Sequence, residues 1–218
     1  MKVLGTIFEN GRRRIDPSKI ETIRKLALLT CVPEGSSFIG SSNFLRDWLP
    51  SISKELAPLT ALLKNKPKRI KLGTEELRCF NIFKNMVIND LALPDSDANI
   101  LVSTDASDKA IAGIIWRELS PSPPETCLSK RKVMPICFYS RILTNSQRNW
   151  STLQKELFAI VMTLNQPNLD SFLLTKHLTL FCDHKNLSYL FSCPDSNRLV
   201  LHWISVLQSF FFDCVHVE

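Results

Sequence analysis

The order of apolar segments after residue 99 constrains the fold of this chain more than any other feature. Three successive segments have the apolar patterns of strands, an amphipathic helix follows them, and a further strand comes after that helix. These segments are residues 100–105, 110–119 and 133–143 for the strands, 151–165 for the helix and 177–183 for the fourth strand. Three antiparallel strands joined through a crossover helix to another strand predict a mixed α/β sheet. A short helix at 186–191, a helix at 199–210 and a fifth strand at 211–218 complete the expected order.

The helix predicted at 151–165 carries one acid on a largely apolar segment. Ser151 is a favourable N-cap, and Gln154 three positions later completes a capping box. The apolar stripe consists of Leu153, Leu157, Ile160, Val161 and Leu164. At about 100° per residue, Glu156 lies about 90° from the centre of this stripe. We therefore expect Glu156 at the edge of the buried face, where its carboxylate can reach the sheet.

Two further acids close predicted strands. Asp105 ends the strand at 100–105 and Asp183 ends the strand at 177–183. A right-handed crossover through the helix would bring both strand ends and Glu156 together. The small residues Ala106, Ser107 and Gly113 are expected to leave room there for a metal ion and a phosphate.

Three gathered carboxylates repel one another, and each pair costs roughly 4 kcal/mol at about 4 Å in an effective dielectric of about 20. A divalent cation reverses the sign of that interaction, and all-oxygen ligands favour Mg²⁺ or Mn²⁺ over zinc. Two such ions about 3.5–4 Å apart activate a water and stabilise the leaving oxygen of a phosphodiester. The acids at 105, 156 and 183 therefore predict metal-dependent hydrolysis of nucleic acid.

Each acid has an ordinary interpretation when it is taken alone. A single Asp at a strand end is usually a turn former, and Asp108 is interpreted in that way. Glu156 alone would be a solvated helix acid. The stretch "TDAS" at 104–107 lacks the Gly of an aspartic protease motif and has no second copy. Only the ordered trio in the α/β pattern indicates a site.

The first 98 residues have a different character. They begin with a hairpin that turns at Asn10–Gly11, and Asp16 then caps a helix that begins with Pro17. Short helices broken by Gly40, Pro50 and Pro58 follow, then a basic run at 64–71, a helix at 74–89 and the turn residues of a boundary at 91–99. Residues 1–98 carry 16 Lys and Arg against 11 Asp and Glu, whereas residues 99–218 carry 11 against 10. The positive excess therefore lies outside the acidic trio and suits a polyanionic partner.

Cysteine usage and hydropathy bear on the compartment. The seven cysteines form no CxxC pair, and the four histidines are too scattered to build a zinc site with them. We find no secretory leader and no apolar run long enough to span a bilayer. Reduced thiols in a cytoplasmic or nuclear protein, not a secreted one, are the expectation.

The residues around the three acids resemble the Pol polyprotein of Ty3/gypsy-type retrotransposons, in the region where reverse transcriptase joins RNase H. "STDASDKAIAG" is similar to the first catalytic strand of that family, and "FYSRIL…QRNWSTLQKELFAIV" to the strand and helix that follow. "LFCDHKNLSYL" resembles the third acidic motif, and "NRLVLHWISVLQSFFFDCVHV" the segment after it. Upstream, "VLGTIFENGRRRIDPSKIETI", "SSFIGSSNFLRDWLPSISKELAPLTALLK" and "LALPD" resemble the thumb and connection. The resemblance covers nearly the whole chain with its motifs in order.

This resemblance implies an α/β (α+β) fold at 99–218, an RNase H-like mixed five-stranded sheet with flanking helices. It implies that residues 1–98 are a small, mainly helical remnant of the end of the palm, the thumb and the connection. Asp105, Glu156 and Asp183 would bind two Mg²⁺ (or Mn²⁺) ions and cut the RNA strand of an RNA–DNA hybrid. The basic N-terminal part would hold duplex backbone without regard to sequence.

Weaker substrate contacts are implied at five positions. Ser140 and Arg141 precede the helix and are candidates for contact with phosphate, although Arg141 is equally interpreted as a surface residue. His184 follows Asp183 and is expected to order the strand end rather than act as a base. Lys68 and Arg69 belong to the basic run, which either binds duplex or is a solvated loop.

The sequence departs from the family pattern in ways that leave two hypotheses open. It has no Tyr-x-Asp-Asp polymerase motif, so the polymerase palm and fingers and the integrase are expected on other parts of a full-length element. The fourth metal-binding Asp of the family follows the last strand, and the chain stops at Glu218 before it, with Asp213 a poor substitute. Leu72 and His202 also depart from the usual residues, an aromatic and an Arg. The first hypothesis is therefore an RNase H-type endonuclease truncated at its C-terminus. The second is an inactive or co-opted remnant that at most binds nucleic acid. A third class, a protein–protein scaffold, has little support.

Overall fold

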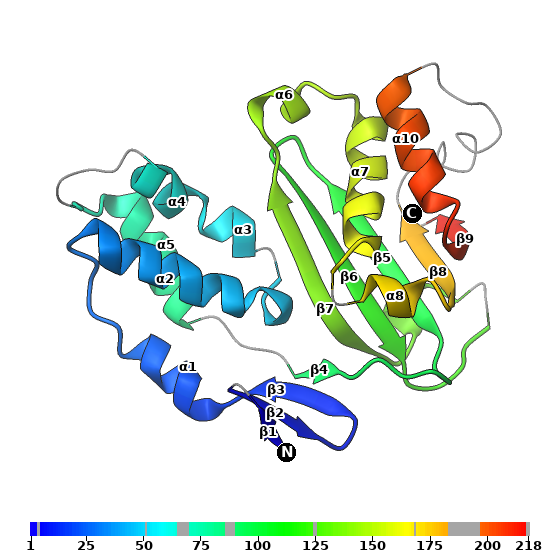
Figure 1. The fold of residues 1–218 in the computed structure, drawn as a ribbon, viewed down its shortest axis with the longest axis horizontal. Coiled ribbons are helices and arrows are strands. Elements are labelled where there is room, and N and C mark those ends of the chain that lie inside the picture. Colours follow the sequence, from blue (N-terminus) through cyan, green and yellow to red (C-terminus); the bar gives the residue numbers. More distant parts are fainter. Residues whose placement is uncertain are drawn as a thin grey trace. The chain divides into compact units, whose positions relative to one another are not determined.

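The computed structural model describes eight stretches of the chain, drawn as coloured ribbon in Figure 1. These are residues 1–3, 5–50, 52–64, 70–85, 90–123, 126–167, 169–182 and 197–216. The chain divides into two compact units, Met1–Leu91 and Ala92–Glu218. The division falls inside the 91–99 segment that has the turn residues of a boundary. Within the described stretches no helix is long and apolar enough to cross a membrane.

The first unit begins with a small antiparallel sheet. Its strands are β1 (Lys2–Val3), β2 (Thr6–Glu9) and β3 (Arg12–Ile15), and β4 (Leu91–Ala92) stands at the division between the units. Strands β2 and β3 pair with Glu9 opposite Arg12. The two residues between them, Asn10 and Gly11, have φ values of 50° and 70°, the left-handed conformation that a two-residue hairpin turn requires. The predicted hairpin is confirmed.

Helices make up the rest of the first unit. They are α1 (Pro17–Arg24), α2 (Val32–Phe44), η1 (Arg46–Trp48), α3 (Ile52–Glu55), α4 (Ala57–Lys64) and α5 (Thr74–Asn85). Asp16 caps α1 as predicted, accepting a hydrogen bond from the Ser18 backbone N–H at 3.0 Å. Its carboxylate also forms an ion pair with Lys2.

The predicted helix break at Gly40 is wrong. Helix α2 runs through this residue, because one glycine costs a helix only about 1 kcal/mol and packing offsets that cost. The ring of Phe38, two residues earlier, lies 5.0 Å from the Phe80 ring and 4.9 Å from the Phe83 ring of α5. Helices α3 and α4 are separated at Leu56, and Pro58 is the second residue of α4, in the first turn, where its missing N–H is not needed.

The second unit contains the predicted mixed sheet of five strands. They are β5 (Ile100–Ala106), β6 (Ala110–Glu118), β7 (Val133–Ile142), β8 (His177–Cys182) and β9 (Phe211–His216). The spatial order is β7-β6-β5-β8-β9. Strand β6 is antiparallel to both β7 and β5, whereas β8 pairs in parallel with both β5 and β9. The fold class expected from the sequence is confirmed.

Helical segments lie between the strands of this sheet along the chain. They are η2 (Leu128–Lys130), α6 (Asn145–Arg148), α7 (Thr152–Leu164), α8 (Asp170–Leu173) and α10 (Arg198–Leu207). Helix α7 lies across β5 and β6, and α10 packs beside it (Figure 1). Ser151 and Gln154 form the predicted capping box at the start of α7, with hydrogen bonds of 3.2 and 3.0 Å. The rings of Trp150, Phe158 and Trp203 join α7 to α10 with centroids 5.1–5.4 Å apart.

A buried ion pair closes the long connection between β6 and β7. Glu118 Oε1 lies 3.0 Å from Arg131 Nη1, and their side chains are 1% and 3% exposed. Arg131 also donates to the backbone carbonyls of Thr126 and Pro123. Burial opposes ionisation of Glu118, but hydrogen bonds from Asn99 and Ser122 and the charge of Arg131 outweigh it and lower the pKa of this carboxyl. The pair therefore holds both ends of the connection at the sheet.

Some expected elements lie outside the described residues. They are the basic run at 65–69, the end of the helix predicted at 74–89, the short helix predicted at 186–191 and the last two residues of the final strand.

Candidate functional site

Asp105 stands near the end of β5, on the face of the sheet that looks away from α7. It is the sixth of seven residues in that strand and is exposed. The register places it beside Ala112 of β6, which in turn pairs with Ser140 of β7, so the three side chains share one row. Thr104 and Gly113 form the adjacent row. Because side chains alternate along a strand, that row faces the opposite side.

At Gly113, α7 approaches the sheet closely. A Cβ atom at residue 113 would lie 2.0 Å from Oγ1 and 2.7 Å from Cγ2 of Thr163. The missing side chain therefore admits the helix. This corrects the expectation that Gly113 keeps space open for a metal ion and a phosphate.

Glu156 lies deeper than predicted. It precedes Thr163 by seven residues, which is two helical turns less about 20°, so both residues are on the side of α7 that faces the sheet. Glu156 is 5% exposed. The predicted position at the edge of the buried face underestimates its burial, because the side of α7 that carries Glu156 faces the sheet.

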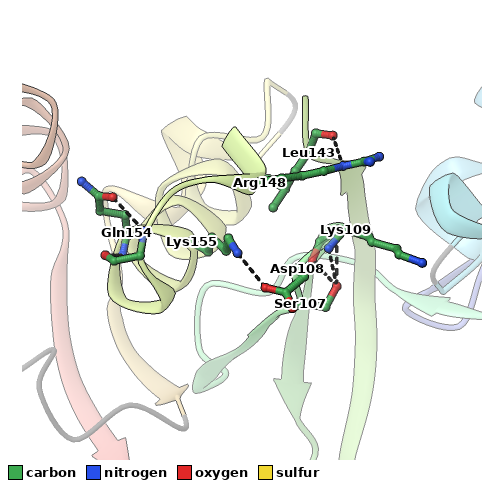
Figure 2. Close-up of polar contacts among 9 residues, drawn as sticks. Ser107, Asp108, Lys109, Leu143, Arg148, Gln154 and Lys155 are labelled. Atoms are coloured by element: carbon green, nitrogen blue, oxygen red, sulfur yellow. Dashed lines mark hydrogen bonds and ion pairs between the residues drawn. The ribbon is translucent and has the colours of Figure 1, made fainter. Parts of the chain in front are cut away.

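An ion pair fixes the N-terminal end of α7 to the turn between β5 and β6. Lys155 Nζ lies 2.7 Å from Asp108 Oδ1, and Figure 2 shows the two side chains pointing toward each other. The hydrogen bond from Lys155 and its positive charge lower the pKa of Asp108. Since Asp108 follows Asp105 by three residues and Lys155 precedes Glu156, the contact places Glu156 at the end of the sheet that carries Asp105.

The turn that presents Asp108 is itself held by hydrogen bonds. Ser107 Oγ accepts from the backbone N–H groups of Lys109 and Ala110 at 3.4 and 3.0 Å. The carbonyl of Lys109 accepts from the Leu143 N–H at 2.9 Å, at the end of β7. Asp108 is thus a turn residue, as interpreted from the sequence, but its carboxylate also has a tertiary partner that the sequence did not reveal.

The complete trio of acids is not described. Asp183 and His184 directly follow β8 and lie outside the described residues, as do Lys68 and Arg69. In the part of the chain that the structure describes, no three His, Cys, Asp or Glu side chains gather closely enough to hold a metal ion. The described acids at the site, Asp105 and Glu156, offer only oxygen ligands, which Mg²⁺ and Mn²⁺ prefer. Assignment of the metal ligands remains a prediction.

Ser140 and Arg141, the two described candidates for phosphate contact, point to opposite faces. Ser140 is buried, with 3% of its surface exposed, in the row of Asp105. Arg141 pairs with Ile111 in the adjoining row and is half-buried. Its guanidinium lies 5.6 Å from the centre of the Phe158 ring and 4.0 Å from Met162 Sδ. Arg141 therefore packs over α7, and a role toward substrate stays a prediction for both residues.

Asp213 lies away from the end of the sheet that carries Asp105. Asp213 pairs with Thr179, near the start of β8. Asp105 lies near the end of β5, which runs parallel to β8, so the two acids are at opposite ends of the sheet. Its exposed carboxylate lies 3.5 Å from His177 Nε2. This position agrees with the interpretation of Asp213 as a poor substitute for a fourth metal ligand.

Comparison with known proteins places this arrangement in a family. Residues 95–210 match the family described as "RNase H-like domain found in reverse transcriptase". The chain is 26% identical over 220 residues to the retrovirus-related Pol polyprotein from transposon 297 of Drosophila melanogaster, covering 99% of this chain and 19% of the relative. It is 24% identical over 222 residues to the retrovirus-related Pol polyprotein from transposon gypsy of the same organism, covering 95% of this chain and 20% of the relative. It is 30% identical over 183 residues to the transposon Tf2-3 polyprotein of Schizosaccharomyces pombe (strain 972 / ATCC 24843), covering 81% of this chain and 13% of the relative. The chain thus spans about a fifth or less of these relatives.

Solved structures share the fold. The foamy viral protease-reverse transcriptase in complex with dsDNA aligns with a TM-score of 0.76 at 18% identity, covering 98% of this chain and 45% of that one. The same protein in complex with an RNA/DNA hybrid aligns with a TM-score of 0.75 at 19% identity, covering 100% of this chain and 29% of that one. The resemblance to retrotransposon Pol sequences is confirmed, and the chain belongs to the family of RNase H-like domains found in reverse transcriptase.

Proposed function

We propose that this chain is an RNase H-type endonuclease that hydrolyses the RNA strand of RNA–DNA hybrids. In this proposal Asp105, Glu156 and Asp183 act together on divalent cations. The observation that carries it is the anchoring of α7 by Lys155 to Asp108, which sets Glu156 at the end of the sheet where Asp105 stands. Membership in the RNase H-like family supports the same chemistry.

The residues present fit Mg²⁺ or Mn²⁺. All three side chains offer carboxylate oxygens, and their mutual repulsion favours a site that is filled by cations. When bound, two such ions polarise the phosphate and lower the pKa of a water molecule that attacks it. Asp105, Glu156 and Asp183 would hold these ions.

The two described acids have different surroundings and therefore different tasks. Asp105 is exposed at a strand end, so its carboxylate is open to a nucleic acid that lies on the sheet. Glu156 is buried on a helix anchored to the sheet, and such support keeps a ligand in its working geometry. A carboxylate with little access to water also interacts more strongly with a cation than an exposed one does. Asp105 would meet the substrate, and Glu156 would hold the cation side of the site.

The first unit would bind the backbone of the duplex. Residues 1–98 carry the positive excess of the chain, and contacts between basic side chains and phosphates require no particular sequence. The foamy viral relatives were solved with dsDNA and with an RNA/DNA hybrid. For this chain we propose a hybrid as substrate, contacts from Lys68 and Arg69, and polymerase and integrase domains as partners in a full-length element.

Hybrid cleavage tests this proposal. The full chain is incubated in Mg²⁺ with a hybrid labelled on its RNA strand, beside labelled single-stranded RNA. We expect cleavage of the hybrid RNA strand that Asp105→Asn abolishes and Asp97→Asn, an exposed acid of the same unit, leaves unchanged. Cleavage that survives Asp105→Asn would exclude the proposed site.

A second candidate is a nucleic-acid-binding remnant without turnover. It is favoured by the position of Asp213, which leaves the end of the sheet near Asp105 without a further acid from β9 among the described residues. This candidate predicts hybrid binding that weakens steeply with salt, and no cleavage. Brisk cleavage by the wild-type chain would exclude it.

A further inference from the structure

We infer that the ion pair between Lys155 and Asp108 is a positioning device that sets the spacing of Asp105 and Glu156. This inference rests on the proposed function and names two residues to which no role is otherwise assigned. The pair joins α7, which carries Glu156, to the turn that follows β5, the strand that carries Asp105. One partner follows Asp105 by three residues, and the other directly precedes Glu156.

Lys155 occupies a place where packing and helix stability both favour another residue. Its side chain is only 7% exposed, and lysine is almost never fully buried unless it is paired. It also stands near the N-terminus of α7, where the helix dipole disfavours a positive charge. A leucine or methionine would fill this position at lower cost. The lysine is therefore explained by its partner rather than by the helix.

Asp108 is a fixed partner although its side chain is 94% exposed. Its turn is held on one side by Ser107 and on the other by the hydrogen bond between Lys109 and Leu143. Figure 2 shows the hydrogen bonds of Ser107 within the turn and Lys155 reaching from the helix to Asp108. The contact thus ties α7 to a rigid part of the sheet.

The second anchor of α7 shows what the ion pair adds. Thr163 packs on Gly113, which fixes the C-terminal part of the helix to β6. Lys155 lies eight residues earlier, about 12 Å along the helix axis. A small rotation about the contact at Thr163 would displace the N-terminal part of α7, where Glu156 lies. The ion pair opposes that rotation and so holds Glu156 at a set distance from the end of β5.

The Mg²⁺ dependence of hybrid cleavage tests this role in the full chain. Loss of residues that orient metal ligands typically lowers metal affinity about 10–100-fold. We expect Asp108→Asn and Lys155→Met to weaken Mn²⁺ binding, measured by isothermal calorimetry, about tenfold or more. The Mg²⁺ concentration for half-maximal cleavage should rise by a similar factor, with an unchanged KM for the hybrid. Saturating Mg²⁺ should restore most of the rate, and Asp108→Glu, which keeps the charge on an exposed side chain, should restore the Mg²⁺ dependence.

Matched controls separate this effect from a general loss of stability. Asp97→Asn and Lys130→Met change exposed residues of the same unit and should leave the Mg²⁺ dependence unchanged. If Lys155→Met does not fold, as judged by circular dichroism, Asp108→Asn decides the test, because residue 108 is on the surface.

The outcomes distinguish this inference from the proposed function. A wild-type chain that shows no Mg²⁺-dependent cleavage overturns the proposed function itself. An active wild-type chain whose Asp108→Asn variant keeps the same Mg²⁺ dependence overturns only the positioning role. A raised KM for the hybrid with unchanged Mg²⁺ dependence also overturns it, because the pair would then contact nucleic acid.

Discussion

Thr163 of α7 lies so close to Gly113 of β6 that a Cβ atom at residue 113 would be 2.0 Å from its hydroxyl oxygen. The contact ties the helix that carries Glu156 to the hairpin that carries Asp105. We expect Gly113→Ala to push α7 from the sheet and to lower the free energy of unfolding by about 1–3 kcal/mol, the usual cost of overpacking a core. Urea denaturation of the full chain, followed by tryptophan fluorescence, measures this change.

Two variants control for the effect of the glycine itself. Gly40→Ala places a methyl group where nothing lies within 4 Å on a helix, so it should be neutral or stabilising by up to about 1 kcal/mol. Adding Thr163→Ala to Gly113→Ala removes the two nearest clashing atoms and should recover part of the loss. Equal stability of Gly113→Ala and wild type would contradict the close contact.

Loss of Glu118 should destabilise the second unit. Glu118→Gln leaves the buried guanidinium of Arg131 without its charged partner, and breaking a buried ion pair from one side costs about 3–5 kcal/mol. The measurement is again the free energy of unfolding in urea. Arg14→Gln, which removes an exposed ion pair with Glu9, should cost about 1 kcal/mol or less. Similar losses for the two variants would argue against the burial of the Glu118 pair.

Stability at acid pH should depend on Asp16. The hydrogen bond from Lys2 and the backbone N–H of Ser18 lower the pKa of this carboxyl from 3.8 to about 2. A depressed pKa means that the ionised group stabilises the folded chain above about pH 4, and that this contribution fades as the pH falls toward 2. Wild type should therefore be more stable than Asp16→Asn at pH 5, and the difference should shrink as the pH falls to 2. A difference that stays constant over this range would contradict the assignment.

Local patterns in the sequence predict much of the second unit. The apolar runs in residues 100–119 and the Ser151–Gln154 capping box depend on neighbours in the chain, so the strands and the start of α7 are predicted correctly. Local patterns do not predict the passage of α2 through Gly40, because it depends on packing against Phe80 and Phe83 of α5.

The site shows the same division between local and tertiary effects. Helical periodicity locates Glu156 at the edge of an apolar stripe, but it does not reveal that this residue lies on the side of α7 that faces the sheet. It also does not pair Lys155 with Asp108, which is 47 residues earlier in the chain. The lysine near the start of a buried helix was the available signal, since both burial and the helix dipole oppose it.

Cation binding tests the central claim, that Asp105, Glu156 and Asp183 together hold divalent metal ions. We would titrate Mn²⁺ into the full wild-type chain by isothermal calorimetry and repeat the titration with Asp105→Asn, Glu156→Gln and Asp183→Asn. Asp213→Asn, in an exposed acid away from the proposed site, serves as the control. The account predicts that each of the three substitutions weakens or abolishes Mn²⁺ binding and that the control does not. Binding by the wild-type chain that survives all three substitutions, or no binding at all, would contradict it.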